Sequence, residues 1–148
     1  MASTVENSTL TVRISEEIEL NNKKLGSTNL HKVKNINEVS ERIVTSLITG
    51  TVLLSMDSAI GAGTFIRDNV KYVRITNLDN QNFVRLAIIT DGTDVHVKIP
   101  ALDSFLLYNG SAASSNTDAS SVTFDSITSI KAWADTASVD LELFVASS

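Results

Sequence analysis

Strict alternation of apolar and polar residues recurs along this chain, and this period of two is the feature that most limits its fold. In the first such segment, polar residues separate five apolar ones: Leu10, Val12, Ile14, Ile18 and Leu20. Residues 94–99 alternate without a break, and residues 139–145 place four apolar side chains on one face. Because successive side chains of a strand point to opposite faces, these segments should cover a core with one face. Glu16 interrupts the first apolar face, which indicates a bulge or an exposed stretch there.

Other segments are apolar on both faces. Residues 83–89 carry only one charged side chain, Arg85, and this composition predicts a central strand or one covered on its second face. Residues 51–56 and 104–108 have a similar composition.

The connections between these segments carry turn residues. Asp91-Gly92 lies between two alternating runs, which is the strongest short signal for a hairpin and favours a type I′ turn. Residues 77–82 form a longer connection whose Asn and Asp side chains can bond to nearby backbone. Residues 71–100 are therefore expected to form a three-stranded meander.

Two stretches are less clear. In residues 37–48, the spacing of Val39, Ile43 and Leu47 fits a helix capped by Asn37, whereas the many β-branched residues favour a strand, and both interpretations stay open. Residues 109–121 consist almost entirely of small and polar residues, which predicts a long surface loop.

About ten short strands with regular turns predict an all-β fold, an antiparallel β-sandwich or jelly roll. The 148 residues are the size of one domain, and a single proline leaves no Pro-rich linker at which to divide them. We therefore expect a sandwich domain at 10–148. Residues 1–9 are polar and suit either a flexible N-terminal arm that orders on binding or a frayed terminus.

Composition argues against several functional classes. The formal net charge of −5 and the shortness of the basic cluster at 31–34 argue against nucleic-acid binding, and we interpret that cluster as a solvated edge. No apolar run reaches 18 residues, so no membrane partner is expected. The absence of cysteine excludes thiol chemistry and cysteine-ligated metal.

No residue pattern indicates catalysis. The two histidines are His31, beside lysines, and His96, on the polar face of a strand, and neither belongs to a nucleophile motif. Gly61-Ala62-Gly63 is not followed by a helix, so a connection between strands is favoured over a phosphate loop. The carboxylates of Asp79, Asp91 and Asp94 could hold calcium, but turns attract Asp for backbone reasons alone. We expect no catalytic, cofactor or metal site.

Aromatic residues are scarce, and Trp133 is the only tryptophan. It falls on the alternating face shared with Ile127, so we interpret it as a core or subunit-interface residue. Tyr108 is the second candidate for an interface. A carbohydrate-binding module would instead expose one of these two rings.

The segments "GAGTFIRDN", "KYVRITNLDNQNFVRLAII" and "VHVKIPALDSFLL", within residues 60–107, resemble small β-sandwich virion proteins of tailed bacteriophages, especially those of marine and cyanobacterial phages. The resemblance implies that Ile75, Leu78, Val84, Leu86 and Ile88 fill the core. It implies that Asn77, Asp79 and Asn82 shape the turn. Where such proteins often carry glycine in the later connection, this chain has Ala101-Leu102-Asp103, so its local backbone should differ.

The resemblance also implies a function. We expect a non-enzymatic capsid decoration, or cement, protein on the virion surface, synthesised in the host cytoplasm, with the major capsid protein and further copies of itself, as a homotrimer, as partners. Such a protein works by binding energy between shell subunits. One alternative is a head–tail adaptor, tail or fibre component. Another is a carbohydrate- or host-surface-binding module.

Overall fold

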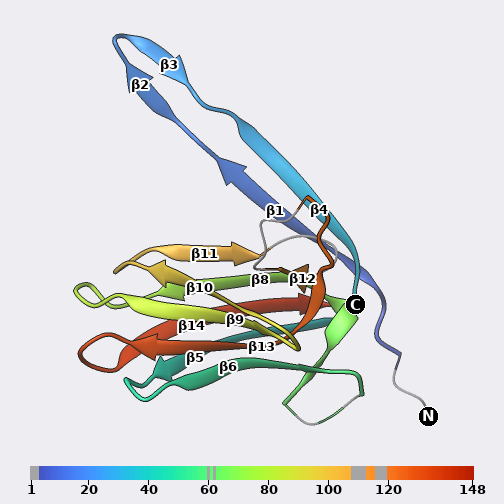
Figure 1. Ribbon diagram of the computed structural model, residues 1–148. Helices are drawn as coiled ribbons and strands as arrows, with labels where there is room; N and C mark the ends of the chain where they lie inside the picture. Colours follow the sequence, from blue (N-terminus) through green and yellow to red (C-terminus); the bar gives the residue numbers. More distant parts are fainter. Residues whose placement is uncertain (1–3, 60, 62, 108–112, 116–119) are drawn as a thin grey trace.

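The computed structural model describes residues 4–59, 61, 63–107, 113–115 and 120–148, and the chain is a β-sandwich from which a long hairpin projects (Figure 1). The prediction of an all-β sandwich in one domain is confirmed. The described residues contain fourteen strands rather than about ten, because the hairpin and two two-residue strands add to the expected set.

The first layer of the sandwich has the strand order β10-β9-β13-β6-β7, with β12 also paired to β13. The bounds are β6 Thr51–Asp57, β7 Phe65–Ile66, β9 Val84–Thr90, β10 Asp94–Ile99, β12 Ala113–Ser114 and β13 Asp125–Ala134. All pairs are antiparallel except β6 with β7, which is parallel. The apolar segment 83–89 supplies β9, which lies between β10 and β13 as a central strand should.

The second layer has the order β11-β8-β14-β5 and is antiparallel throughout. Its bounds are β5 Glu38–Ser46, β8 Val70–Asn77, β11 Ser104–Leu107 and β14 Val139–Ser147, and a 3-10 helix, η1 Arg67–Asn69, leads into β8. The segment that fitted both a helix and a strand is thus the strand β5. Its β-branched residues suit the pleated surface, and β14 pairs with it over nine residues.

The main core lies between the two layers. Its fully buried side chains come from both sheets and include Leu53, Leu54, Ile75, Leu86, Ile127, Ile130, Leu141 and Leu143. Of the five residues expected in the core from the resemblance, four are buried, but Leu78 is 40% exposed. The inner face of β8 continues from Ile75 to Asn77, so the next residue, Leu78, points outward.

The alternating segment at residues 10–20 does not cover the sandwich core as expected. It forms β1 Ser8–Ser15 and β2 Ile18–Leu20, which pair with β4 Thr28–Ile36 and β3 Lys23–Leu25 respectively. Figure 1 shows these four strands as one narrow ribbon extending away from the layers. Glu16 and Glu17 lie in the exposed break between β1 and β2, where the sequence indicated a bulge or an exposed stretch.

Much of the small-residue stretch at 109–121 lies outside the described residues. Within it, Ala113–Ser114 form β12 and pair with β13, so this part is a strand and not loop. Of the proposed N-terminal arm, residues 4–7 have no regular structure, and Ser8 begins β1.

Candidate interaction surface

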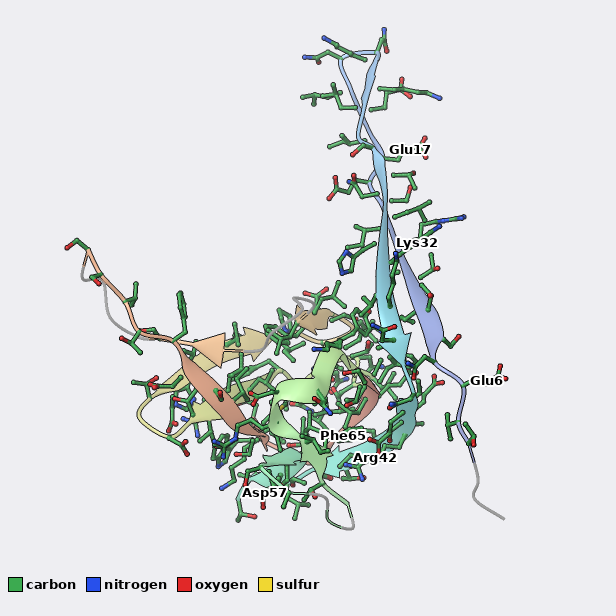
Figure 2. The ribbon with its side chains drawn as sticks, turned by 90° about the vertical axis from the view of Figure 1, so that its right-hand side faces the viewer. Glu6, Glu17, Lys32, Arg42, Asp57 and Phe65 are labelled. Carbon is green, nitrogen blue, oxygen red and sulfur yellow. The ribbon has the colours of Figure 1, made fainter. Side chains whose placement is uncertain are left out.

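The hairpin of residues 8–36, called the arm from here on, is the most distinctive surface of the molecule. Figure 2 shows it standing out from the sandwich, with Glu17 and Lys32 on the projecting part. Ser15 pairs with Thr28 at the end of the β1–β4 ladder, and Ile18 pairs with Leu25 in the outer β2–β3 ladder. The arm therefore reaches beyond the sandwich as a two-stranded ribbon without a second layer.

Local sequence explains why the arm turns where it does. Asn21 and Asn22, between β2 and β3, have φ values of 50° and 62°, the backbone of a type I′ turn. Asparagine tolerates this left-handed region better than most residues. Below the tip, Gly26 has φ of 125°, and a Cβ there would lie 1.9 Å from the carbonyl oxygen of Glu16. Only glycine fits at this point, where the two sides of the hairpin approach each other closely.

The outer part of the arm exposes apolar side chains on one face. Ile18, Leu20 and Leu25 are 56%, 58% and 47% exposed, and the β2–β3 register places them on the same side of the ribbon. Single exposed apolar residues are ordinary on protein surfaces, but a group of three on a projecting ribbon is typical of a contact site.

The inner part of the arm packs against the sandwich. Leu10, Val12, Val33 and Ile36 join a second hydrophobic cluster with Tyr72, Phe144 and Ala146 from β8 and β14. The Tyr72 and Phe144 rings meet edge to face, with centroids 5.8 Å apart. This cluster, the arm root, fixes the direction of the ribbon through aromatic and aliphatic packing.

Close to the arm root, β5 is an edge strand of its sheet. Its outward side chains Val39 and Ile43 are 56% and 66% exposed. Glu41 lies between them on the same face, and Asp140 of β14, also on that face, accepts a hydrogen bond from Thr45 Oγ1 at 2.7 Å. The outer face of β5 is therefore apolar with acidic neighbours, and long edge strands of this kind are sites of pairing with other chains.

Charge is divided unequally between the arm and the sandwich. Residues 8–36 contain five basic and three acidic residues, whereas residues 37–148 contain seven basic and thirteen acidic residues. The arm therefore carries a net charge of +2, and residues 37–148 carry a net charge of −6.

The expected turn residues Asn77, Asp79 and Asn82 form one hydrogen-bonded network. Asn77 is fully buried, and its amide nitrogen donates to the carbonyl oxygens of Asn82 at 2.9 Å and Pro100 at 3.1 Å. Its side-chain oxygen accepts from the Asp79 amide at 3.0 Å. These contacts tie the β8–β9 connection to the connection that follows β10.

Asp79 organises the exposed side of that connection. One carboxylate oxygen accepts from the backbone amides of Asn82 at 2.6 Å and Gln81 at 2.7 Å, and these two hydrogen bonds lower the pKa of Asp79 below its ordinary value of 3.8. The Asn82 side chain in turn accepts from Thr136 Oγ1 at 2.8 Å.

The Asp91-Gly92 hairpin forms between β9 and β10, but not with a type I′ turn. Neither central residue has a positive φ. Thr90 closes the turn instead: its Oγ1 accepts from the Thr93 amide at 2.9 Å and donates to the Thr93 carbonyl at 2.7 Å. The Asp91 carboxylate pairs with Arg67 at 3.1 Å.

Trp133 does not share a face with Ile127, and it lies outside the core. The β13–β9 register shifts between Ile127 and Ser129, so inward and outward positions exchange along β13. Trp133 is therefore half-buried on the outer face of its sheet, with the Arg85 guanidinium carbon 4.5 Å from its ring centroid. Tyr108, the other candidate interface residue, lies outside the described residues.

The remaining titratable groups are dispersed. His31 lies on the arm, whereas His96 is exposed on β10, pointing away from the core as expected. Among the described residues, no group of three or more His, Cys, Asp or Glu gathers as metal ligands. In the same part of the chain, no helix is long and apolar enough to cross a membrane.

Comparisons with known proteins add no relative: no family model, curated protein or solved structure matches this chain.

The alternation of residues 10–20 does not reveal that this segment leaves the sandwich, because a ribbon and a strand of the sandwich have the same period of two. The signal that could have distinguished them is Asn21-Asn22, a two-residue pair tolerant of positive φ between the short alternating runs 18–20 and 23–25.

Proposed function

We propose that this protein is a non-enzymatic structural subunit of a bacteriophage virion, a capsid decoration protein that binds between subunits of the major capsid protein. The observation that carries the proposal is the arm, whose exposed Ile18, Leu20 and Leu25 need a neighbouring protein to cover them. The resemblance of residues 60–107 to virion β-sandwich proteins supports the choice of assembly.

In this proposal the arm is the part that reaches the neighbour. The projecting ribbon places apolar side chains away from its own sandwich, where another subunit can bury them. These three side chains are already about half covered within the arm, so completing their burial contributes roughly 1 kcal/mol each. Such a contact holds neighbouring subunits together by binding energy alone.

The outer face of β5 is the receiving surface when the neighbour is a second copy of the chain. Val39 and Ile43 match the apolar tip, and Glu41 and Asp140, which lie on the same face, can pair with lysines of the arm. Arm and receiving strand are adjacent in one molecule, joined by Asn37, so copies can exchange arms around a closed ring, as in the expected homotrimer.

The first experiment is the copy number of this chain in purified particles, measured by quantitative mass spectrometry against the major capsid protein. A ratio near one per shell subunit supports decoration. A ratio that fits one small ring or a few spikes points to an adaptor, tail or fibre component instead. Complete absence from particles contradicts the virion proposal.

The second experiment assigns the role of the arm. Ile18→Ser with Leu20→Ser removes apolar tip side chains without changing charge, and Val52→Ser, at a 49% exposed site on the sandwich, is the matched control. We expect the tip variant to lose incorporation into particles while the control keeps it.

The molar mass of each purified variant, measured by light scattering, then shows whether the arm binds a second copy of this chain or the shell. A tip variant that becomes monomeric binds copies of itself through the arm, and one that keeps its oligomeric state uses the arm on the shell. Normal incorporation and an unchanged mass would show that the arm has neither role.

A further inference from the structure

The outer face of the six-stranded sheet carries a second surface, independent of the arm. The β10–β9 and β9–β13 registers place Lys98, Arg85 and Trp133 in one row across three strands. His96 and Lys131 flank the small residue Ala87 in the next row. Four of these five side chains are cations or a histidine, gathered on the most acidic part of the molecule.

The aromatic rings hold these cations in place. The Arg85 guanidinium carbon lies 4.5 Å from the Trp133 centroid, and Lys131 Nζ lies 5.4 Å from it. Lys98 Nζ lies 4.1 Å above the Phe83 ring, and the His96 ring lies 6.3 Å from Trp133. Cation–π contacts orient a cation without neutralising its charge or filling its hydrogen-bond donors.

Arg85 differs from the other arginines of the sandwich in having no acceptor. Arg42 donates to the Leu53 carbonyl, Arg67 pairs with Asp91, and Arg74 pairs with Glu142. Within the described residues, no carboxylate or carbonyl accepts from Arg85, and neither Lys98 nor Lys131 forms an ion pair. A stacked guanidinium with free N–H groups is a preorganised fork for a planar oxyanion.

A surface depression of about 320 Å³ lies beside this fork. Its lining combines apolar surface, a donor and an acceptor: Ile48, Phe83, Arg85, Trp133, Ala134 and Asp135. Gly50 lets the indole edge of Trp133 pack closely against the backbone, because a Cβ there would lie 2.6 Å from Trp133 Nε1. The depression therefore offers an apolar floor with a cation and a carboxylate at its edge.

We propose that this face binds an acidic sugar unit of a polysaccharide, with the sugar carboxylate on Arg85 and the sugar ring in the depression. Lys98, Lys131 and His96 supply the surrounding positive field, and Asp135 accepts from a sugar hydroxyl. Mixed donors, acceptors and aromatic surface suit a sugar ring that carries hydroxyls on its edge and C–H groups on its face. A dense polyphosphate is disfavoured, because Asp135 lies in the depression and residues 37–148 carry an excess of six acidic residues, thirteen against seven basic.

The test uses the intact protein and three probes: an oligogalacturonate tetrasaccharide, its methyl-esterified neutral counterpart, and a single-stranded oligo-dT of the same charge. Trp133 is the only tryptophan, so its fluorescence reports directly on this face. We expect saturable binding of the oligogalacturonate, with at least about tenfold weaker binding of the ester.

Variants then locate the site. Arg85→Met should weaken oligogalacturonate binding about tenfold or more, and Asp135→Asn should weaken it less. Arg13→Met on the arm removes another arginine without a hydrogen-bond acceptor among the described residues and should leave the affinity unchanged. Thermal melts establish that each variant is folded, and Lys98→Met serves if Arg85→Met is not.

The proposal is overturned if the oligogalacturonate gives no saturable signal, if the methyl ester binds equally well, or if Arg85→Met and Lys98→Met leave the affinity unchanged. Tighter binding of oligo-dT than of the tetrasaccharide would overturn it in favour of a nucleic acid. None of these results depends on particles or on the arm, so the sugar site and the proposed virion function are tested independently of each other.

Discussion

At the scale of single residues, the buried side-chain amide of Asn77 should contribute more to the stability of the fold than its position in a turn suggests. Its side chain donates to carbonyl oxygens of two separate connections and accepts from a third backbone group. Asn77→Ala leaves these buried groups unpaired and should cost about 2–4 kcal/mol of unfolding free energy. Asn77→Asp should cost more, because it turns a carboxylate toward carbonyl oxygens. Urea denaturation measures both, with exposed Asn80→Ala as the control, and equal stability of the two Asn77 variants would contradict the assigned donor role.

Leu102, in the connection between β10 and β11, has a strained backbone. Its φ of 63° lies in the left-handed region, and the Asp103 amide donates to the Pro100 carbonyl across it at 3.3 Å, as in a type II turn. The Leu102 side chain is 66% exposed and contributes little packing. Leu102→Gly should therefore stabilise the protein by about 0.5–1 kcal/mol. This is the backbone strain that glycine relieves, minus the larger conformational entropy that glycine has in the unfolded state. Leu102→Ala retains the strain and should show no such gain in the same denaturant titration.

Asp79 should give the sandwich a defined acid sensitivity. Its folded pKa lies below the ordinary 3.8 because the Asn82 and Gln81 amides donate to the carboxylate. A lowered folded pKa means that this stabilisation is complete above pH 3.8 and is lost as the pH falls from there through the folded value. Asp79→Asn keeps an acceptor but not the charge, so its Tm should fall less than that of the wild type across this range. Thermal melts of both proteins at a series of pH values spanning 3.8 measure the difference. If Tm depended on pH in the same way for both proteins, Asp79 would make no contribution.

At the scale of elements, the sequence predicted which segments are strands better than it predicted where each strand lies. Alternation identified β1, β10 and β14, and apolar content identified β9 as central, because both patterns depend on local chain geometry. Trp133 was assigned to the wrong face, because the bulge between Ile127 and Ser129 exchanges inward and outward positions without an obvious local signal. The Arg85–Trp133 surface could not be predicted either, since it depends on which strands become neighbours.

The outer arm should be dispensable for folding. Ser15 and Thr28 pair across the ribbon, so a two-residue Asn-Gly turn can replace residues 16–27 without disturbing the inner ladder. Every residue removed is exposed and belongs to neither hydrophobic cluster. The shortened protein should therefore unfold within about 0.5 kcal/mol of the wild type, as ordinary surface changes do. A loss of several kcal/mol in urea denaturation would mean that the outer arm folds back onto the sandwich.

At the scale of the whole molecule, two hydrophobic clusters have different structural roles. The main core joins the two sheets, while the arm root joins the inner arm to the outer face of the second sheet and sets the direction in which the arm projects. The projecting ribbon needs this second cluster, because a two-stranded ribbon on its own is only marginally stable in water. The arm root is thus the link between the fold and the proposed assembly role.

The arm root can be tested by measuring how firmly it holds the arm. The chain has no cysteine, so Glu19→Cys near the tip and Ala137→Cys on the sandwich accept spin labels at two defined, exposed positions. Electron paramagnetic resonance should give one narrow distance distribution in this background. Ile36→Ala leaves a cavity beneath the ribbon and should broaden that distribution, with a loss of about 2–4 kcal/mol at most. Leu141→Ala in the main core is the matched control, because it should lower stability as much or more while leaving the distribution narrow. If both variants broadened the distances equally, the arm direction would depend on the whole sandwich rather than on its root.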